Sequence, residues 1–150
     1  MLKKIIITLL GLFIFLTSPI SAQASEVQSE VQIPNEIQLS LIDIKPTWVN
    51  ILEFRNDFNI LSGGKATVDV RVYAYSASQV KIQAYLQQYV NGNWTTIKTW
   101  ELTSNSNSCN LGDYYYVNNG YSYRLISIGT VYQNGVQVEQ AGKVSDTIYF

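Results

Sequence analysis

The pair Asn91-Gly92 constrains the fold of this chain more than any other feature, because a run rich in β-forming residues lies on each side of it. An Asn-Gly pair in this setting favours a type I′ turn, in which both central residues have positive φ, and it is the strongest short-range signal for a β-hairpin. If these two residues form the turn, Val90 lies opposite Asn93, and the register of the hairpin follows by counting outward.

The two faces of the predicted hairpin differ in chemistry. Side chains alternate between the faces with a period of two, so the register decides which residues lie together. We expect the core side to be the face with the aliphatic side chains Ile82, Ala84, Leu86 and Ile97. The opposite face carries rings and polar groups, namely Gln83, Tyr85, Gln87, Tyr89, Trp94, Thr96, Lys98 and Trp100. A bulge before Trp94 would instead turn its ring inward, and the sequence leaves both arrangements open.

The rest of the chain favours strands over helices. Residues 65–75 alternate between small apolar side chains, from Ala66 to Ala74, and polar or aromatic ones, which indicates a strand with one buried face. Turn signals at 62–64, 118–120 and 134–135 separate further runs of β-forming residues. About seven strands joined by short turns predict an all-β fold, an antiparallel immunoglobulin-like β-sandwich.

Three further predictions concern individual strands. Leu39–Ile44 is expected to form a first short strand, and Trp48–Leu61 a strand with a bulge rather than a helix. The pair Asn134-Gly135 predicts a second tight hairpin. Its uninterrupted register places Gln133 opposite Val136, Val131 opposite Val138, and Leu125 opposite Val144.

The segment Val117–Leu125 resembles the tyrosine corner of fibronectin type III and related immunoglobulin-like domains. The resemblance rests on the spacing from the apolar Val117 through Gly120 to Tyr123. In those domains a Tyr near the start of the penultimate strand hydrogen-bonds back to the preceding turn. The resemblance implies that Tyr123 has this role here and that Leu125 follows it on the core face. The disulfide of antibody domains is absent.

The N-terminus has the pattern of a signal peptide. Two lysines precede the apolar run Ile5–Leu16, which is followed by Ala22-Gln23-Ala24, so signal peptidase would recognise Ala22 and Ala24 and cleave before Ser25. The run is shorter than the ~20 residues of a membrane-spanning helix. We therefore expect a secreted protein without a stable membrane span, with residues 1–24 as signal peptide, 25–36 as flexible linker and 37–150 as the domain. An uncleaved N-terminal anchor is the alternative.

Charge and composition disfavour several functions. Without the two leader lysines the chain has eight basic residues against eleven acidic ones, so binding to nucleic acid is not expected. There is no histidine, which removes the Ser-His-Asp triad, the Cys-His pair and histidine-containing zinc sites. The acids Asp57, Asp69, Asp113 and Asp146 stand apart in the sequence and are expected to be solvated. We expect no enzyme, no metal site and no cofactor.

Cys109 is the only cysteine, so the chain has no internal disulfide. It lies in the polar segment Thr103–Asn110, which is expected to be a loop. Because no basic group is its neighbour in the sequence, a reactive thiolate is not expected. The thiol is then unreactive or available for pairing with another molecule.

Four short motifs are similar to those of a family of small secreted proteins of Gram-positive bacteria. They are GGKA at 63–66, LQ-x-Y at 86–89, NG-x-W at 91–94 and GYxYR at 120–124. The resemblance covers most of the chain after the leader and implies export and the fold, but no activity, because the family is a domain of unknown function. Members often carry a Cys in the strand after GGKA, whereas Thr67-Val68-Asp69 stands there in this chain.

The aromatic face of the hairpin is the candidate binding site, formed by Tyr85, Tyr89, Trp94 and Trp100. Rings flanked by amides can stack on sugars or anchor a protein partner. Alternatively, some of these rings belong to the core. The first functional hypothesis is a non-catalytic extracellular binding module for an unknown ligand, a glycan or a cell-surface protein. The second is a small secreted antagonist, either bacteriocin-like or an enzyme inhibitor.

Overall fold

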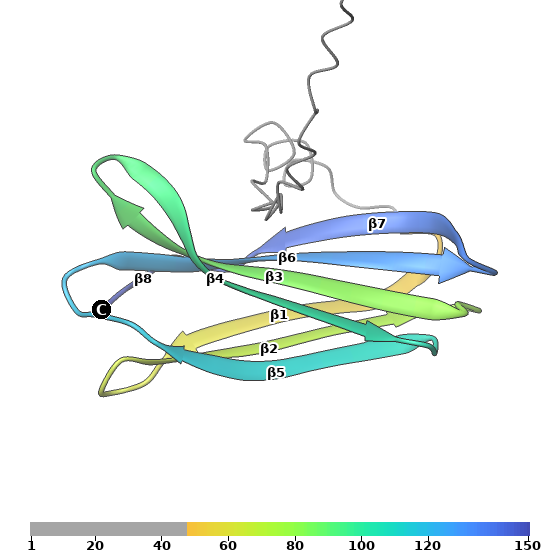
Figure 1. Ribbon diagram of the computed structural model, residues 1–150, viewed down its shortest axis with the longest axis horizontal. Coiled ribbons are helices and arrows are strands. Elements are labelled where there is room, and N and C mark those ends of the chain that lie inside the picture. The colour runs from red at the N-terminus through yellow and green to blue at the C-terminus, as the bar shows by residue number, and fades with distance from the viewer. Residues whose placement is uncertain (1–47) are drawn as a thin grey trace, which may run out of the picture. The chain divides into compact units, whose positions relative to one another are not determined.

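The computed structural model describes residues 48–150, which form eight β-strands and no helix (Figure 1). The predicted leader, the linker and the predicted strand Leu39–Ile44 lie outside the described residues. The strands are β1 (Ile51–Ile60), β2 (Lys65–Ala74), β3 (Gln79–Val90), β4 (Asn93–Ser104), β5 (Ser108–Tyr116), β6 (Ser122–Gln133), β7 (Val136–Val144) and β8 (Ile148–Tyr149).

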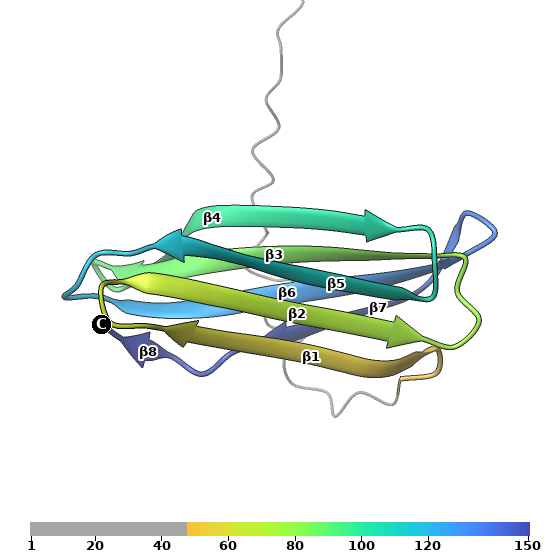
Figure 2. The ribbon, with the colours of Figure 1, turned by 90° about the horizontal axis from the view of Figure 1, so that it is seen from below.

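The strands form two sheets that pack face to face. One sheet has the order β1-β2-β5, and the other has the order β4-β3-β6-β7, with β8 also paired to β6. All neighbouring strands are antiparallel. Figure 2 looks onto the sheet β1-β2-β5, with the other sheet behind it. The predicted antiparallel β-sandwich is therefore confirmed.

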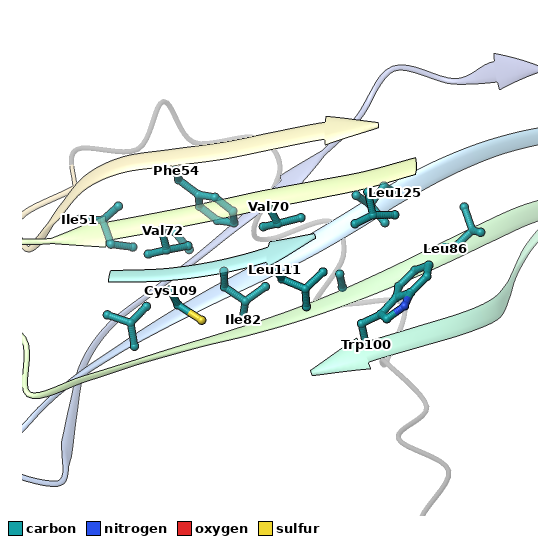
Figure 3. Close-up of a cluster of buried hydrophobic side chains, with 14 of the residues drawn as sticks. Ile51, Phe54, Val70, Val72, Ile82, Leu86, Trp100, Cys109, Leu111 and Leu125 are labelled. Atoms are coloured by element: carbon teal, nitrogen blue, oxygen red, sulfur yellow. The ribbon is translucent and has the colours of Figure 1, made fainter. Parts of the chain in front are cut away.

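The core lies between the sheets, where the strands place their apolar side chains. The alternation in β2 is confirmed, because the side chains from Ala66 to Ala74 on its inner face are almost completely buried. The predicted inner face of β3, with Ile82, Ala84 and Leu86, meets them from the other sheet (Figure 3). Burial of these aliphatic groups is the main source of stability of such a sandwich.

Both Asn-Gly turns have the predicted geometry. The φ angles are 51° at Asn91 and 82° at Gly92, and 50° at Asn134 and 79° at Gly135. The turn before β2 depends on Gly64, which has φ of 80° and whose added Cβ would collide with the carbonyl oxygen of Val117. Only glycine fits this close approach of two backbones.

The first hairpin follows the predicted register only near its turn. Val90 lies opposite Asn93 and Tyr89 opposite Trp94, as expected. Between Leu86 and Gln87 the register shifts, because Ile97 is an extra residue in β4. Such a bulge exchanges the faces of all residues beyond it. Trp100 consequently lies opposite Ala84 and is buried in the core at 8% exposure (Figure 3), so its predicted outward orientation is wrong.

The second hairpin has a bulge as well. Gln133 lies opposite Val136 as predicted, but Val138 is an extra residue in β7. Val131 therefore pairs with Glu139 rather than with Val138. The predicted pairing of Leu125 with Val144 is also wrong, because Val144 lies opposite Ile126. A shift between Ile51 and Glu53 shows that β1 also contains the bulge expected for this strand.

Two individual side chains complete the core. The Tyr123 hydroxyl donates a hydrogen bond to the Asn118 carbonyl at 2.7 Å, which is the bond expected of a tyrosine corner. Cys109 lies in strand β5 and not in a loop, and it is buried with its Sγ 3.6 Å from the Leu102 carbonyl oxygen. Burial raises the pKa of this thiol, so the reactive thiolate is disfavoured.

Candidate functional site

The strongest candidate for a binding site is a group of side chains on the outer face of the sheet β4-β3-β6-β7, at the turn end of the β3–β4 hairpin. We call it the Trp94 cluster, and it consists of Gln87, Tyr89, Trp94 and Arg124. The Tyr89 and Trp94 rings lie opposite each other with centroids 5.2 Å apart and planes at 55°. The Tyr89 side chain is 43% exposed, and the end of this hairpin turns away from the body of the sandwich (Figure 1).

Arg124 joins the two strands of this hairpin to β6. Its guanidinium carbon lies 4.3 Å from the centroid of the Trp94 ring, which places the cation over one ring face. Its Nε donates a hydrogen bond of 2.9 Å to the Gln87 side-chain oxygen, and the Gln87 amide nitrogen donates to the Thr96 hydroxyl at 3.3 Å. Burial lowers the pKa of Arg124, but an arginine stays charged in proteins. The cluster therefore holds a stacked arginine and two rings in a fixed arrangement.

The structure brings together only two of the four rings that the sequence predicts for this site. Tyr89 and Trp94 meet at the hairpin end, whereas Trp100 belongs to the core. Tyr85 lies on the predicted outer face of β3, but it is buried against Ile126 and Ile128. Desolvation raises the pKa of its hydroxyl, and the nearby Glu101 adds to the shift.

Arg124 is a member of the site that the sequence did not predict. The alternation of side chains along β6 indicates that Arg124 points outward, because its neighbours Tyr123 and Leu125 are core residues. Its contact with Trp94 depends on the pairing of β6 with β3, which places Arg124 opposite Gln87. This pairing joins segments far apart in the chain, and no turn sequence encodes it.

A second aromatic surface lies on the outer side of the sheet β1-β2-β5. Tyr114 and Tyr116 of β5 contact each other edge to face at 5.8 Å, and the Lys65 ammonium lies 4.1 Å from the Tyr114 ring centroid. Beside them is an open hollow of about 390 Å³ above Gly112, lined in part by Asp57 and Asp69. These two acids lie directly opposite each other on β1 and β2, as like charges on a solvated face.

Within residues 48–150, no three His, Cys, Asp or Glu side chains come together in a way that could hold a metal ion. In the same part of the chain no helix has the length and apolar character needed to cross a membrane. The buried ionisable groups Tyr85, Cys109 and Tyr123 all have a pKa raised mainly by desolvation. Burial thus favours their neutral forms.

Comparison with known proteins found no match that would indicate a function. No protein-family model matches this sequence, and no curated protein matches it. The likeness of its four short motifs to secreted proteins of Gram-positive bacteria therefore stays a prediction.

Proposed function

We propose that this chain is a secreted, non-catalytic binding module that attaches to a protein partner through the Trp94 cluster. The observation that carries the proposal is the stacking of Arg124 on Trp94 beside the exposed ring of Tyr89. Trp, Tyr and Arg are the residues that most often dominate the free energy of protein–protein binding. The signal-peptide pattern of the first 24 residues supports export.

A protein partner suits this arrangement better than a glycan. A sugar ring stacks on a free aromatic face, but Arg124 covers one face of the Trp94 ring and Tyr89 is tilted against it. The hydrogen bonds from Arg124 to Gln87 and from Gln87 to Thr96 hold the cation in place before any partner arrives. A side chain that is already ordered loses less conformational entropy on binding, which favours affinity.

The proposal is tested with the labelled chain Ser25–Phe150 on intact Gram-positive cells. We expect retention that disappears when the cell surface is first treated with a protease. Trp94→Ala should weaken binding by about 30-fold, the usual loss at a residue that dominates an interface. Tyr75→Ala is the matched control and should bind like the unchanged chain, because Tyr75 is an exposed ring that follows β2 in the other sheet.

Two outcomes would contradict the proposal. One is retention of the chain on purified wall polysaccharide that survives protease treatment, which would identify a glycan as the ligand. The other is a folded Trp94→Ala variant, shown by circular dichroism, that binds protein on the cells as tightly as the unchanged chain. Growth inhibition of related bacteria by the purified chain would instead support the antagonist hypothesis.

A further inference from the structure

An apolar cluster separate from the core lies on the outer face of the sheet β4-β3-β6-β7. This outer-face cluster consists of Tyr85 of β3 with Ile126 and Ile128 of β6, and Val144 of β7 packs against it. Their chain neighbours Leu86 and Leu125 belong to the core, so the alternation of the strands directs the cluster to the opposite side. The exposed fractions of the three side chains are nevertheless only 3%, 4% and 7%.

The described strands do not account for this burial. Side chains stand roughly perpendicular to a sheet, so the tips of rings and methyl groups reach water unless something lies on them. The strands that pack on β3 and β6 from outside their own sheet are β1, β2 and β5. All three belong to the opposing sheet, which covers the inner face. Within residues 48–150, the outer-face cluster thus has no strand above it.

The described part of the chain begins at the border of this same sheet. The carboxylate of Glu139 in β7 accepts hydrogen bonds from the backbone N–H groups of Val49, Asn50 and Ile51, at 2.9, 2.7 and 2.7 Å. The Lys143 ammonium, also in β7, lies 5.5 Å from the centroid of the Trp48 ring. β7 is the strand next to β6, which carries Ile126 and Ile128.

The residues that precede Trp48 have the composition needed to cover the cluster. Residues 37–44 read IQLSLIDI, with Ile37, Leu39 and Leu41 in alternation and two more isoleucines after them, and the sequence predicts a strand at Leu39–Ile44. We propose that residues 37–44 pack across the outer face of the sheet β4-β3-β6-β7 and cover the outer-face cluster.

The distances allow this arrangement. Residues 45–47 can span about 10 Å when extended, at roughly 3.3 Å per residue. Trp48 packs against the core between the sheets, so residues 45–47 have to pass around the edge strand β7 before the chain reaches the outer face. Residues 37–44 span a further distance of about 26 Å, at roughly 3.3 Å per residue, whereas β3 lies two strand spacings of about 4.8 Å each from β7. The segment can therefore place its apolar side chains over β6 and β3. It would then lie beside the Trp94 cluster on the same face, without being part of the proposed partner site.

The direct test is NMR on the chain Ser25–Phe150 with labelled Ile and Leu methyl groups. We expect nuclear Overhauser contacts from the methyl groups of residues 37–44 to the ring of Tyr85 and to the methyl groups of Ile126 and Ile128. Random-coil shifts for the methyl groups of residues 37–44, without such contacts, would overturn the proposal. Because this measurement uses the unchanged sequence, it does not depend on the folding of a variant.

A second test replaces the four residues Leu39, Leu41, Ile42 and Ile44 by Ser. We expect the uncovered cluster to increase the fluorescence of the dye ANS several-fold, while the matched control Val27→Ser with Val31→Ser in the linker leaves it unchanged. If a second copy of the chain covers the face instead, the unchanged chain sediments as a dimer and Ile128→Asp makes it monomeric. That result, or equal dye binding by all three chains, would overturn the proposal.

Discussion

The β3–β4 and β6–β7 hairpins begin from the same local structure, an Asn-Gly turn with both residues at positive φ. In each hairpin the second strand then contains one extra residue, Ile97 in β4 and Val138 in β7. The bulge comes five residues into β4 but three residues into β7. Because the bulge lies at a different distance from the turn in each hairpin, the second strand of each hairpin reverses its inward and outward faces at a different position.

The two bulges have different structural effects. In β4 the extra residue turns Trp100 from the outer face into the core, where it fills space under the edge of the sheet β4-β3-β6-β7. In β7 the extra residue turns Glu139 toward the opposing sheet, where its carboxylate binds three backbone N–H groups at the start of β1. One bulge adds apolar burial to the core, and the other adds a polar connection between two edge strands.

The largest expected effect concerns the bulge in β4, which turns Trp100 into the core. Trp100→Ala should lower the free energy of unfolding by about 3–5 kcal/mol, because it leaves a cavity in the core. Trp94→Ala removes the same side chain from the outer face of the same strand and should cost about 1 kcal/mol or less. Urea denaturation of both variants measures the difference. Equal losses would mean that the bulge does not separate a core Trp from a surface Trp.

The next effect concerns the bulge in β7, which turns Glu139 toward the start of β1. Glu139→Ala leaves three backbone N–H groups of residues 49–51 without their acceptor and should lower the free energy of unfolding by about 2 kcal/mol. Hydrogen exchange of these three amides should become faster than in the unchanged chain. Gln140→Ala, at the next position of β7, is the control and should leave their exchange as it is. Unchanged exchange in Glu139→Ala would show that the carboxylate does not hold the start of β1.

A smaller effect tests the feature that the two hairpins share. Gly92→Ala and Gly135→Ala should each cost about 1 kcal/mol, because a Cβ is strained at these positive φ angles. An added Cβ would meet no other atom within 4 Å at either position, so backbone strain is the whole effect. Thermal denaturation should give closely similar shifts for the two variants. A difference of more than a factor of two would show that the turns are not equivalent.

The smallest effect is the pH dependence of stability that Cys109 contributes through its burial beside β4. Its pKa is raised from the ordinary value of 9.0, so the unfolded chain loses this proton at a lower pH than the folded one. The contribution is therefore complete below about pH 9 and is lost as the pH rises through the folded-state pKa. Cys109→Ala should flatten the decline in unfolding free energy between pH 8 and pH 10. The same slope in both chains would contradict the assignment.

Much of the fold could be predicted because it depends on local patterns. The alternation in β2 indicated its buried face, and the Asn-Gly pairs indicated both turns. The candidate site was predictable only within a few residues of a turn, where Tyr89 and Trp94 still follow the counted register. Beyond the bulge the prediction failed for Trp100, and Arg124 was missed because it reaches the cluster from a strand distant in the sequence.

The sequence by itself determined where most of the strands and the tight turns lie, since these follow from side-chain period and backbone preference over a few residues. The role of Tyr123 in the corner was indicated by the resemblance to fibronectin type III domains. Only the tertiary structure decided where each hairpin takes up its extra residue. A bulge costs little locally, and its place is set by which side chain fits the space between the two sheets. That choice buried Trp100, aimed Glu139 at β1 and left Trp94 on the surface beneath Arg124.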